Sequence, residues 1–199
     1  MGRIISIETD SDRIIAVDPS FSSTGIVWTL DHNRIGSMTM RSFSRTQTLA
    51  WIDCIRRILR ELKKEVEPDL FLIEAPAFGA QGKATVSMGQ LNGILRSMAR
   101  VTAPKLLEIS PMTWKRLVFG AEGFFKGRGK STGSPMKKST KAEKEIYIQW
   151  CADHYHHKFH SVDEVDAFYL VTAYSTVQRG LAPDNIAKRM LARIEVTHA

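Results

Sequence analysis

Residues 14–28 carry the sequence IIAVDPSFSSTGIVW, and this stretch decides the fold that we expect. Its first four residues form a continuous apolar run, which is typical of a strand buried on both faces at the centre of an α/β sheet. One carboxylate, Asp18, follows directly at the end of this run. Because Asp is unfavourable in strands and costly to bury alone, Asp18 either starts the following turn or has a function. The stretch by itself leaves both interpretations open.

The rest of the chain predicts a mixed sheet with helices on its faces, an α/β fold. We expect strands at 13–17, 24–30, 35–43, 70–74 and 105–109, and helices at 46–66, at 84–103, from Pro111, through Ile146 and Trp150, and from Ser161. A chain of 199 residues can bury one sizeable core, so we expect a single domain over 1–199. Its predicted appendages are an N-terminal arm at 1–12, a mobile basic loop at 120–138, and a tail at 183–199 that is a short amphipathic helix or disordered.

The composition is that of an ordinary globular protein, with 43% hydrophobic and 25% charged residues. No apolar run approaches the ~20 residues of a membrane span and no signal-peptide pattern opens the chain, so we expect no membrane partner. Cys54 and Cys151 build no disulfide framework, which indicates a reducing compartment such as the cytoplasm.

The net charge of +7 is concentrated in one segment. Between Trp114 and Lys144 there are nine Lys and Arg residues against two Glu residues, so this segment alone carries a charge of +7. Bases and acids balance in the remainder of the chain. Such a concentration favours a polyanionic partner, and nucleic acid is the leading candidate.

Two predicted strands end in a carboxylate. Asp18 ends the first strand and Glu74 ends the strand at 70–74. If these strands are neighbours, both side chains lie at the carboxyl edge of the sheet, where open α/β sheets bind their ligands.

The last long helix adds two more carboxylates. Ser161 and Glu164 form a capping box that marks its start. Asp163 and Asp166 are three residues apart and therefore share a face. Asp163 could simply complement the helix dipole, but apolar residues surround Asp166 in the sequence.

Four carboxylates in one place would repel one another strongly unless divalent cations neutralise them. Ligands that are all oxygen suit magnesium or manganese rather than zinc. Two such ions, ~4 Å apart, can activate water and stabilise the leaving oxygen in phosphodiester hydrolysis.

Several ordered motifs resemble one known family. They are Ile15-Ala16-Val17-Asp18-Pro19 with Thr24-Gly25, Leu72-Ile73-Glu74 with Phe78, residues 87–93, Ser110-Pro111 with Lys115, residues 141–144, and Asp163-x-x-Asp166-Ala167. Over roughly residues 13–178 this series resembles the RuvC family of Holliday-junction resolvases, in the RNase H-like (retroviral integrase) superfamily. Two departures are Ser20, where the family commonly has Gly, and a longer, more basic segment at 120–138. They suggest a divergent branch, either bacterial or phage-encoded, which would act in the bacterial cytoplasm or in that of the host.

The resemblance implies an RNase H-like, five-stranded mixed sheet flanked by helices, and a Mg²⁺-dependent endonuclease that resolves four-way junctions. It implies that Asp18, Glu74, Asp163 and Asp166 hold two Mg²⁺ ions, with Mn²⁺ as a substitute. It also implies that Lys141 or Lys144 contacts the phosphate near the scissile bond, and the choice between them stays open. The implied partners are branched DNA and a second copy of the chain, because symmetric cutting needs two sites.

Further residues are candidates for contact with DNA. Phe78 would either act as a wedge at the branch point or anchor a buried loop. The basic candidates are Lys83, Lys115, Lys126, Arg128, Lys130, Lys137 and Lys138.

Other functions compete with junction resolution. One alternative is an RNase H-like nuclease that acts on RNA, flaps or forks, and another is a non-catalytic DNA-binding module of the same fold. The first strand also resembles that of actin-like ATPases, but no second glycine-rich phosphate motif follows. The series Cys151, His154, His157 and His160 has a regular spacing but lacks that of a closed zinc module, so we expect no metal there.

Overall fold

The computed structural model of the chain describes residues 12–20, 22–30, 34–41, 48–76, 83–119, 145, 148–149, 151–153 and 155–197. The strands are β1 (Ile14–Asp18), β2 (Ser23–Leu30), β3 (Arg34–Arg41), β4 (Leu70–Glu74), β5 (Lys105–Ile109) and β6 (Glu195–Val196). The helices are α1 (Thr48–Val66), α2 (Lys83–Thr102), α3 (Pro111–Phe119), α5 (Val162–Gln178) and α6 (Asp184–Leu191). Most predicted bounds agree with these to within about two residues, the usual uncertainty of an element end.

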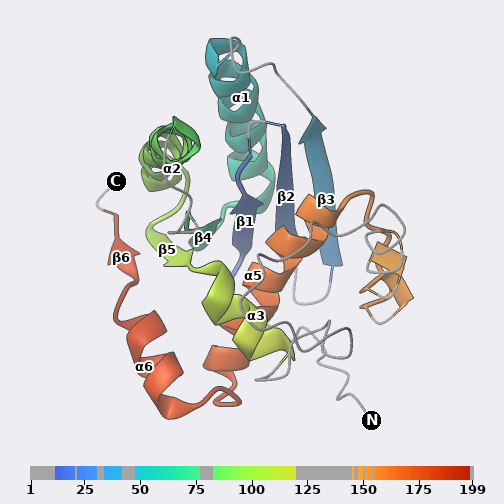
Figure 1. Ribbon diagram of the computed structural model, residues 1–199, viewed down its shortest axis with the longest axis vertical. Helices are drawn as coiled ribbons and strands as arrows, with labels where there is room; N and C mark the ends of the chain where they lie inside the picture. The colour runs from blue at the N-terminus through green and yellow to red at the C-terminus, as the bar shows by residue number, and fades with distance from the viewer. Residues whose placement is uncertain are drawn as a thin grey trace.

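The strands form one mixed sheet in the order β3-β2-β1-β4-β5-β6 (Figure 1). β1, β4 and β5 are parallel neighbours, whereas β2, β3 and β6 pair antiparallel to theirs. The prediction of an α/β mixed sheet flanked by helices is therefore confirmed. The predicted five strands are all present. The tail forms α6, in agreement with the helical alternative for 183–199, and it adds a two-residue sixth strand, β6, which the sequence did not predict.

The apolar run of β1 is buried on both faces of the sheet. Ile14 and Ala16 pack into a core with α3 and α5, and Ile15 and Val17 pack into a second core with α1 and α2. Figure 1 shows these two helix pairs on opposite faces of the sheet. A central strand covered on both sides needs no alternation of polar residues, which explains the continuous run.

The helix α5 packs across the sheet at β1 and β2, and thirteen of its residues are buried. Ser161 caps its start, because the hydroxyl of Ser161 accepts a hydrogen bond from the backbone N–H of Glu164. None of the described helices is long and apolar enough to cross a bilayer.

Candidate active site

Asp18 and Glu74 lie side by side at the carboxyl edge of the sheet. β1 and β4 are parallel with Val17 opposite Ile73, so the next residue of each strand is a carboxylate. Burial raises the pKa of Asp18 well above its usual range, and the hydrogen bond with Glu74 and the negative charge of Glu74 raise it further. Two carboxyls this close are not both charged without a large cost, so a proton or a cation must lie between them.

The start of α5 brings Asp163 and Asp166 to the same place, since the negative charges of both also raise the pKa of Asp18. The approach depends on Gly25, which pairs with Asp18 across β1 and β2. A Cβ atom on Gly25 would lie 1.9 Å from the carbonyl oxygen of Asp163, so only glycine lets the helix come this close. The hydroxyl of Ser23 then donates a hydrogen bond of 2.5 Å to Oδ2 of Asp163.

A tryptophan holds Glu74 from the other side. The side chain of Trp114, on α3, is 1% exposed, and its Nε1–H donates a 3.0 Å hydrogen bond to Oε1 of Glu74. Its ring stacks on Tyr169 of α5 at a centroid distance of 5.5 Å. The Nζ of Lys115 lies 4.9 Å from the centre of the Trp114 ring. Core packing and the position of an acid are therefore linked through one side chain.

Glu164 is a buried carboxylate with a different environment. Its side chain is 1% exposed and accepts hydrogen bonds from the hydroxyls of Ser37 (2.8 Å) and Thr39 (2.5 Å) on β3, and from the backbone N–H of His160 (3.0 Å). Ser161 and Glu164 were predicted to form a capping box, and the half in which Ser161 accepts is present. The carboxylate itself turns to β3 instead, and so holds the first turn of α5, with Asp163, on the sheet.

The carboxylates at this edge fit a hard divalent cation by their donor chemistry, because every donor is an oxygen atom. No Lys or Arg in the described ranges forms an ion pair with Asp18, Glu74 or Asp163. In the same ranges, however, no three His, Cys, Asp or Glu side chains are arranged as a metal-binding group. The acids lie at one edge of the sheet, where Asp18 and Glu74 are hydrogen-bonded to each other. The two-metal site stays a prediction.

The predicted DNA contacts are only partly within the described residues. Lys115 is exposed on α3. Lys83 is the first residue of α2, and the position of its side chain is not described. The others lie outside the described residues: Phe78, Lys126, Arg128, Lys130, Lys137, Lys138, Lys141 and Lys144. The basic loop predicted at 120–138 and the N-terminal arm up to residue 11 lie outside them too.

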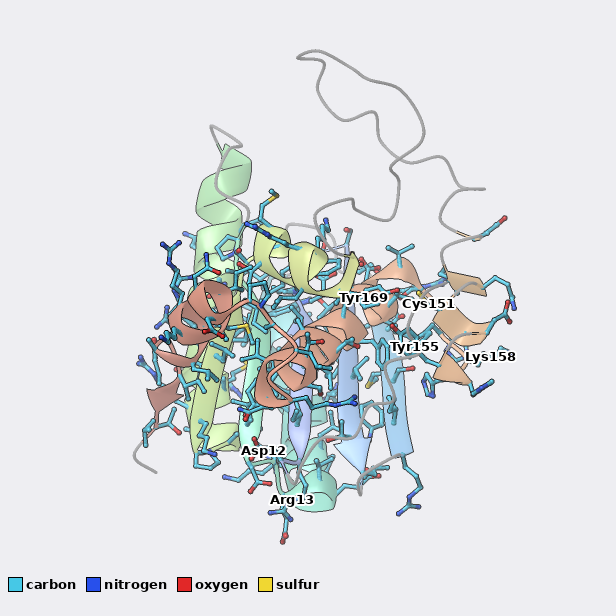
Figure 2. All side chains as sticks on the ribbon, turned by 90° about the horizontal axis from the view of Figure 1, so that it is seen from below. Asp12, Arg13, Cys151, Tyr155, Lys158 and Tyr169 are labelled. Carbon is cyan, nitrogen blue, oxygen red and sulfur yellow. The ribbon has the colours of Figure 1, made fainter. Side chains whose placement is uncertain are left out.

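Cys151 and His157, two of the regularly spaced Cys and His residues, have separate partners, and His154 lies outside the described residues. The Sγ of buried Cys151 lies 2.8 Å from the hydroxyl of Tyr169, and burial raises the pKa of this thiol to about 12, with a smaller contribution from the charge of Asp166. Figure 2 shows Cys151, Tyr155 and Tyr169 close together. Nε2 of His157 lies 2.9 Å from the Ser37 hydroxyl, and burial lowers the pKa of His157.

The sequence did not point to three of the residues that organise this edge. Ser23 on β2 and the hydroxyl residues Ser37 and Thr39 on β3 belong to no sequence motif, because their role depends on which strands α5 lies against. Trp114 was predicted to be a core residue, and it is. Its indole N–H was the missed signal, since a buried Trp usually needs a hydrogen-bond acceptor.

Solved structures of junction resolvases share this fold. Thermus thermophilus RuvC in complex with a Holliday junction substrate superimposes with a TM-score of 0.61 at 11% identity, over 85% of this chain and 97% of that one. A second structure of Thermus thermophilus RuvC gives 0.58 at 14% identity, over 84% and 96%. The yeast mitochondrial Holliday junction resolvase Ydc2 gives 0.51 at 12% identity, over 95% and 92%. No family model and no curated protein matches the sequence. The resemblance to RuvC is thus confirmed at the level of the fold.

Proposed function

We propose that this chain is a metal-dependent endonuclease that hydrolyses phosphodiester bonds in branched DNA, principally in four-way junctions. The observation that carries the proposal is the gathering of Asp18, Glu74, Asp163 and Asp166 at one edge of the sheet. The fold, shared with resolvases of which one is bound to a Holliday junction, supports the choice of substrate.

The four acids would hold Mg²⁺ or Mn²⁺, which supplies a Lewis acid and an activated water when bound. The chain itself positions the ligands. The indole of Trp114 orients Glu74, and the hydroxyl of Ser23 orients Asp163. The close contact at Gly25 fixes how far the start of α5 stands from β2. Water attacks the phosphate in line, and no side chain becomes covalently attached to the DNA.

The charge of the chain suits a nucleic-acid substrate. The net charge of +7 favours association with phosphates through counterion release, so binding weakens as salt rises. Symmetric cutting of two strands needs two active sites, so the active form is a homodimer on a single junction.

RNA, flaps and forks are the alternative substrates, and a non-catalytic DNA-binding module is the alternative class. The module is disfavoured because all four acids are present and lie at one edge. Nothing at this edge selects among the nuclease substrates, so the experiment compares them directly.

The test uses purified chain with labelled four-way junction, fork, flap, RNA–DNA hybrid and linear duplex, in Mg²⁺, Mn²⁺ or EDTA. We expect cleavage of the junction ahead of the others, only with a divalent ion. The variants Asp18→Asn and Glu74→Gln should bind the junction and not cut it, whereas Asp69→Asn, an acid of the opposite edge, should cut normally. Preference for linear duplex, or full cleavage in EDTA, would contradict the proposal.

A further inference from the structure

The outer face of α3 carries exposed residues that do not belong to the acidic site. Met112 is 80% exposed, and Lys115 and Arg116 are also exposed. These positions are three and four residues apart, so they share one face of the helix. Trp114 and Leu117 pack into the core on the inner side. The helix is amphipathic, yet its solvent side presents a large apolar side chain one turn before two cations.

This face lies at the carboxyl edge of the sheet. α3 follows β5, whose last residue, Ile109, pairs with Glu74. Figure 2 shows α3, in yellow, at the end of the sheet opposite to Asp12 and Arg13. Through Trp114 the helix is hydrogen-bonded to Glu74. α3 therefore stands beside the acids, and this face of the helix is open to solvent.

The charges identify the kind of partner. α3 contains no acidic residue, and in the described part of the chain no carboxylate pairs with Lys115 or Arg116. Two cations that lack acidic partners beside a group of acids suit a phosphate-bearing chain, whose phosphates the cations bind. Met112 suits the bases, because flexible, polarisable and apolar side chains insert at disrupted base steps.

We propose that this face of α3 contacts the branched nucleic acid, with Met112 against a base that is unstacked at the branch point and Lys115 and Arg116 on the flanking phosphates. The inference rests on the proposed function and extends it, because it names a residue that distinguishes a branch point from a continuous duplex. A linear duplex offers no free base face to Met112, whereas its phosphates remain available to the two cations.

The experiment uses the full chain in EDTA, to prevent hydrolysis, with a four-way junction that carries 2-aminopurine at the branch point. We expect the wild-type chain to raise the fluorescence as the base unstacks. Met112→Ala should lose most of that rise and bind the junction about tenfold more weakly, at the lower end of what one base–aromatic contact contributes, with duplex affinity unchanged. Met112→Leu should keep the signal.

Two sets of variants separate the roles. Val101, 68% exposed near the end of α2, is the matched control, and Val101→Ala should change nothing. Lys115→Ala and Arg116→Ala should weaken junction and duplex binding alike, and each should lower the slope of log affinity against log salt by about one.

The role of Met112 is overturned if Met112→Ala equals Val101→Ala in fluorescence and affinity. It is also overturned if Met112→Ala changes the sedimentation of the free chain, which would assign this face to a protein contact. If wild-type chain cuts junctions in Mg²⁺, either result removes only this role. If wild-type chain neither cuts junctions nor prefers them to duplex, the proposed function fails, and the role of Met112 fails with it.

Discussion

The acids at the two edges of the sheet, where the parallel strands begin and where they end, have opposite environments. At the amino edge, Nη1 of Arg13 lies 2.9 Å from Glu67, and its Nε lies 3.2 Å from Asp69. Asp12 accepts a 2.6 Å hydrogen bond from the hydroxyl of Tyr174 and has Lys105 at 3.7 Å. Figure 2 shows Asp12 and Arg13 together at this end.

At the carboxyl edge, Asp18, Glu74 and Asp163 have neutral donors or one another as neighbours, and no base among the described residues. Paired acids stabilise a fold, whereas gathered acids repel and destabilise it unless a ligand neutralises them. The difference supports the proposal that the carboxyl edge binds a cation, and it indicates that the acids of the amino edge are structural.

Glu164 shows that burial alone does not mark a functional acid. It is 1% exposed, yet hydroxyl and amide donors surround it. Its neighbours satisfy the charge, as expected for a buried acid with a structural role.

The strongest test of the difference between the two edges is the substitution Asp18→Asn. We expect cleavage to fall by at least about a thousandfold, because several kcal/mol of charge stabilisation are lost with a metal ligand. We expect the free energy of unfolding at pH 7 to rise by about 1 kcal/mol, because the raised pKa of Asp18 means that ionising it in the folded chain costs stability as the pH rises above about 4.

The measurements are single-turnover cleavage in Mg²⁺ and urea unfolding without metal. A variant that cuts at the wild-type rate, or that is clearly less stable, would show that the carboxyl edge is structural like its counterpart.

Gly25→Ala tests how α5 is held at that edge. The added methyl would lie 1.9 Å from the carbonyl oxygen of Asp163, so α5 must shift, and we expect a loss of about 3 kcal/mol together with most of the cleavage. Gly93→Ala is the control, because apart from the adjoining backbone of α2 no atom lies within 4 Å of its added Cβ. In the middle of α2 it should stabilise by about 1 kcal/mol. Equal melting temperatures for the two variants would refute the close contact.

Glu164→Ala and Glu164→Gln test the contrast between Glu164, which accepts hydrogen bonds from neutral donors, and the acids that lie together at the carboxyl edge. Alanine leaves the hydroxyls of Ser37 and Thr39 without their acceptor, and we expect a loss of about 2 kcal/mol. Glutamine keeps one accepting oxygen and should lose about half as much. Thermal unfolding measures the loss of stability in both variants. Junction binding that stays normal in the glutamine variant would show that the role of Glu164 is structural only. Stability that rises in either variant would contradict it.

Asp69→Asn should have the smallest effect. Partial burial raises the pKa of Asp69, but the hydrogen bonds from the side chain and backbone of Arg13 outweigh it and leave this pKa lowered. A lowered pKa gives stability above about pH 4 that is lost as the pH falls through the folded value. We therefore expect a slight decrease in melting temperature at pH 7 that disappears in acid, with cleavage unchanged. A large loss of cleavage would end the distinction between the two edges.

Much of the fold was predictable from local patterns. The apolar runs ending at Asp18 and Glu74 predicted buried strands, and Ser161 predicted the start of α5. The two-residue β6 was missed, because a pair of residues has no periodicity to detect and forms a strand only by pairing with Lys105 and Leu106.

The sequence by itself determined which acids end strands and begin a helix, because apolar periodicity and capping act over a few neighbouring residues. The tertiary structure alone decided what those acids meet. That Gly25 admits the start of α5, that Trp114 holds Glu74, and that Glu164 turns to β3 are contacts between segments 40 to 140 residues apart. Local sequence carries no information on such distances, because they follow from the order of strands and the packing of a helix across them.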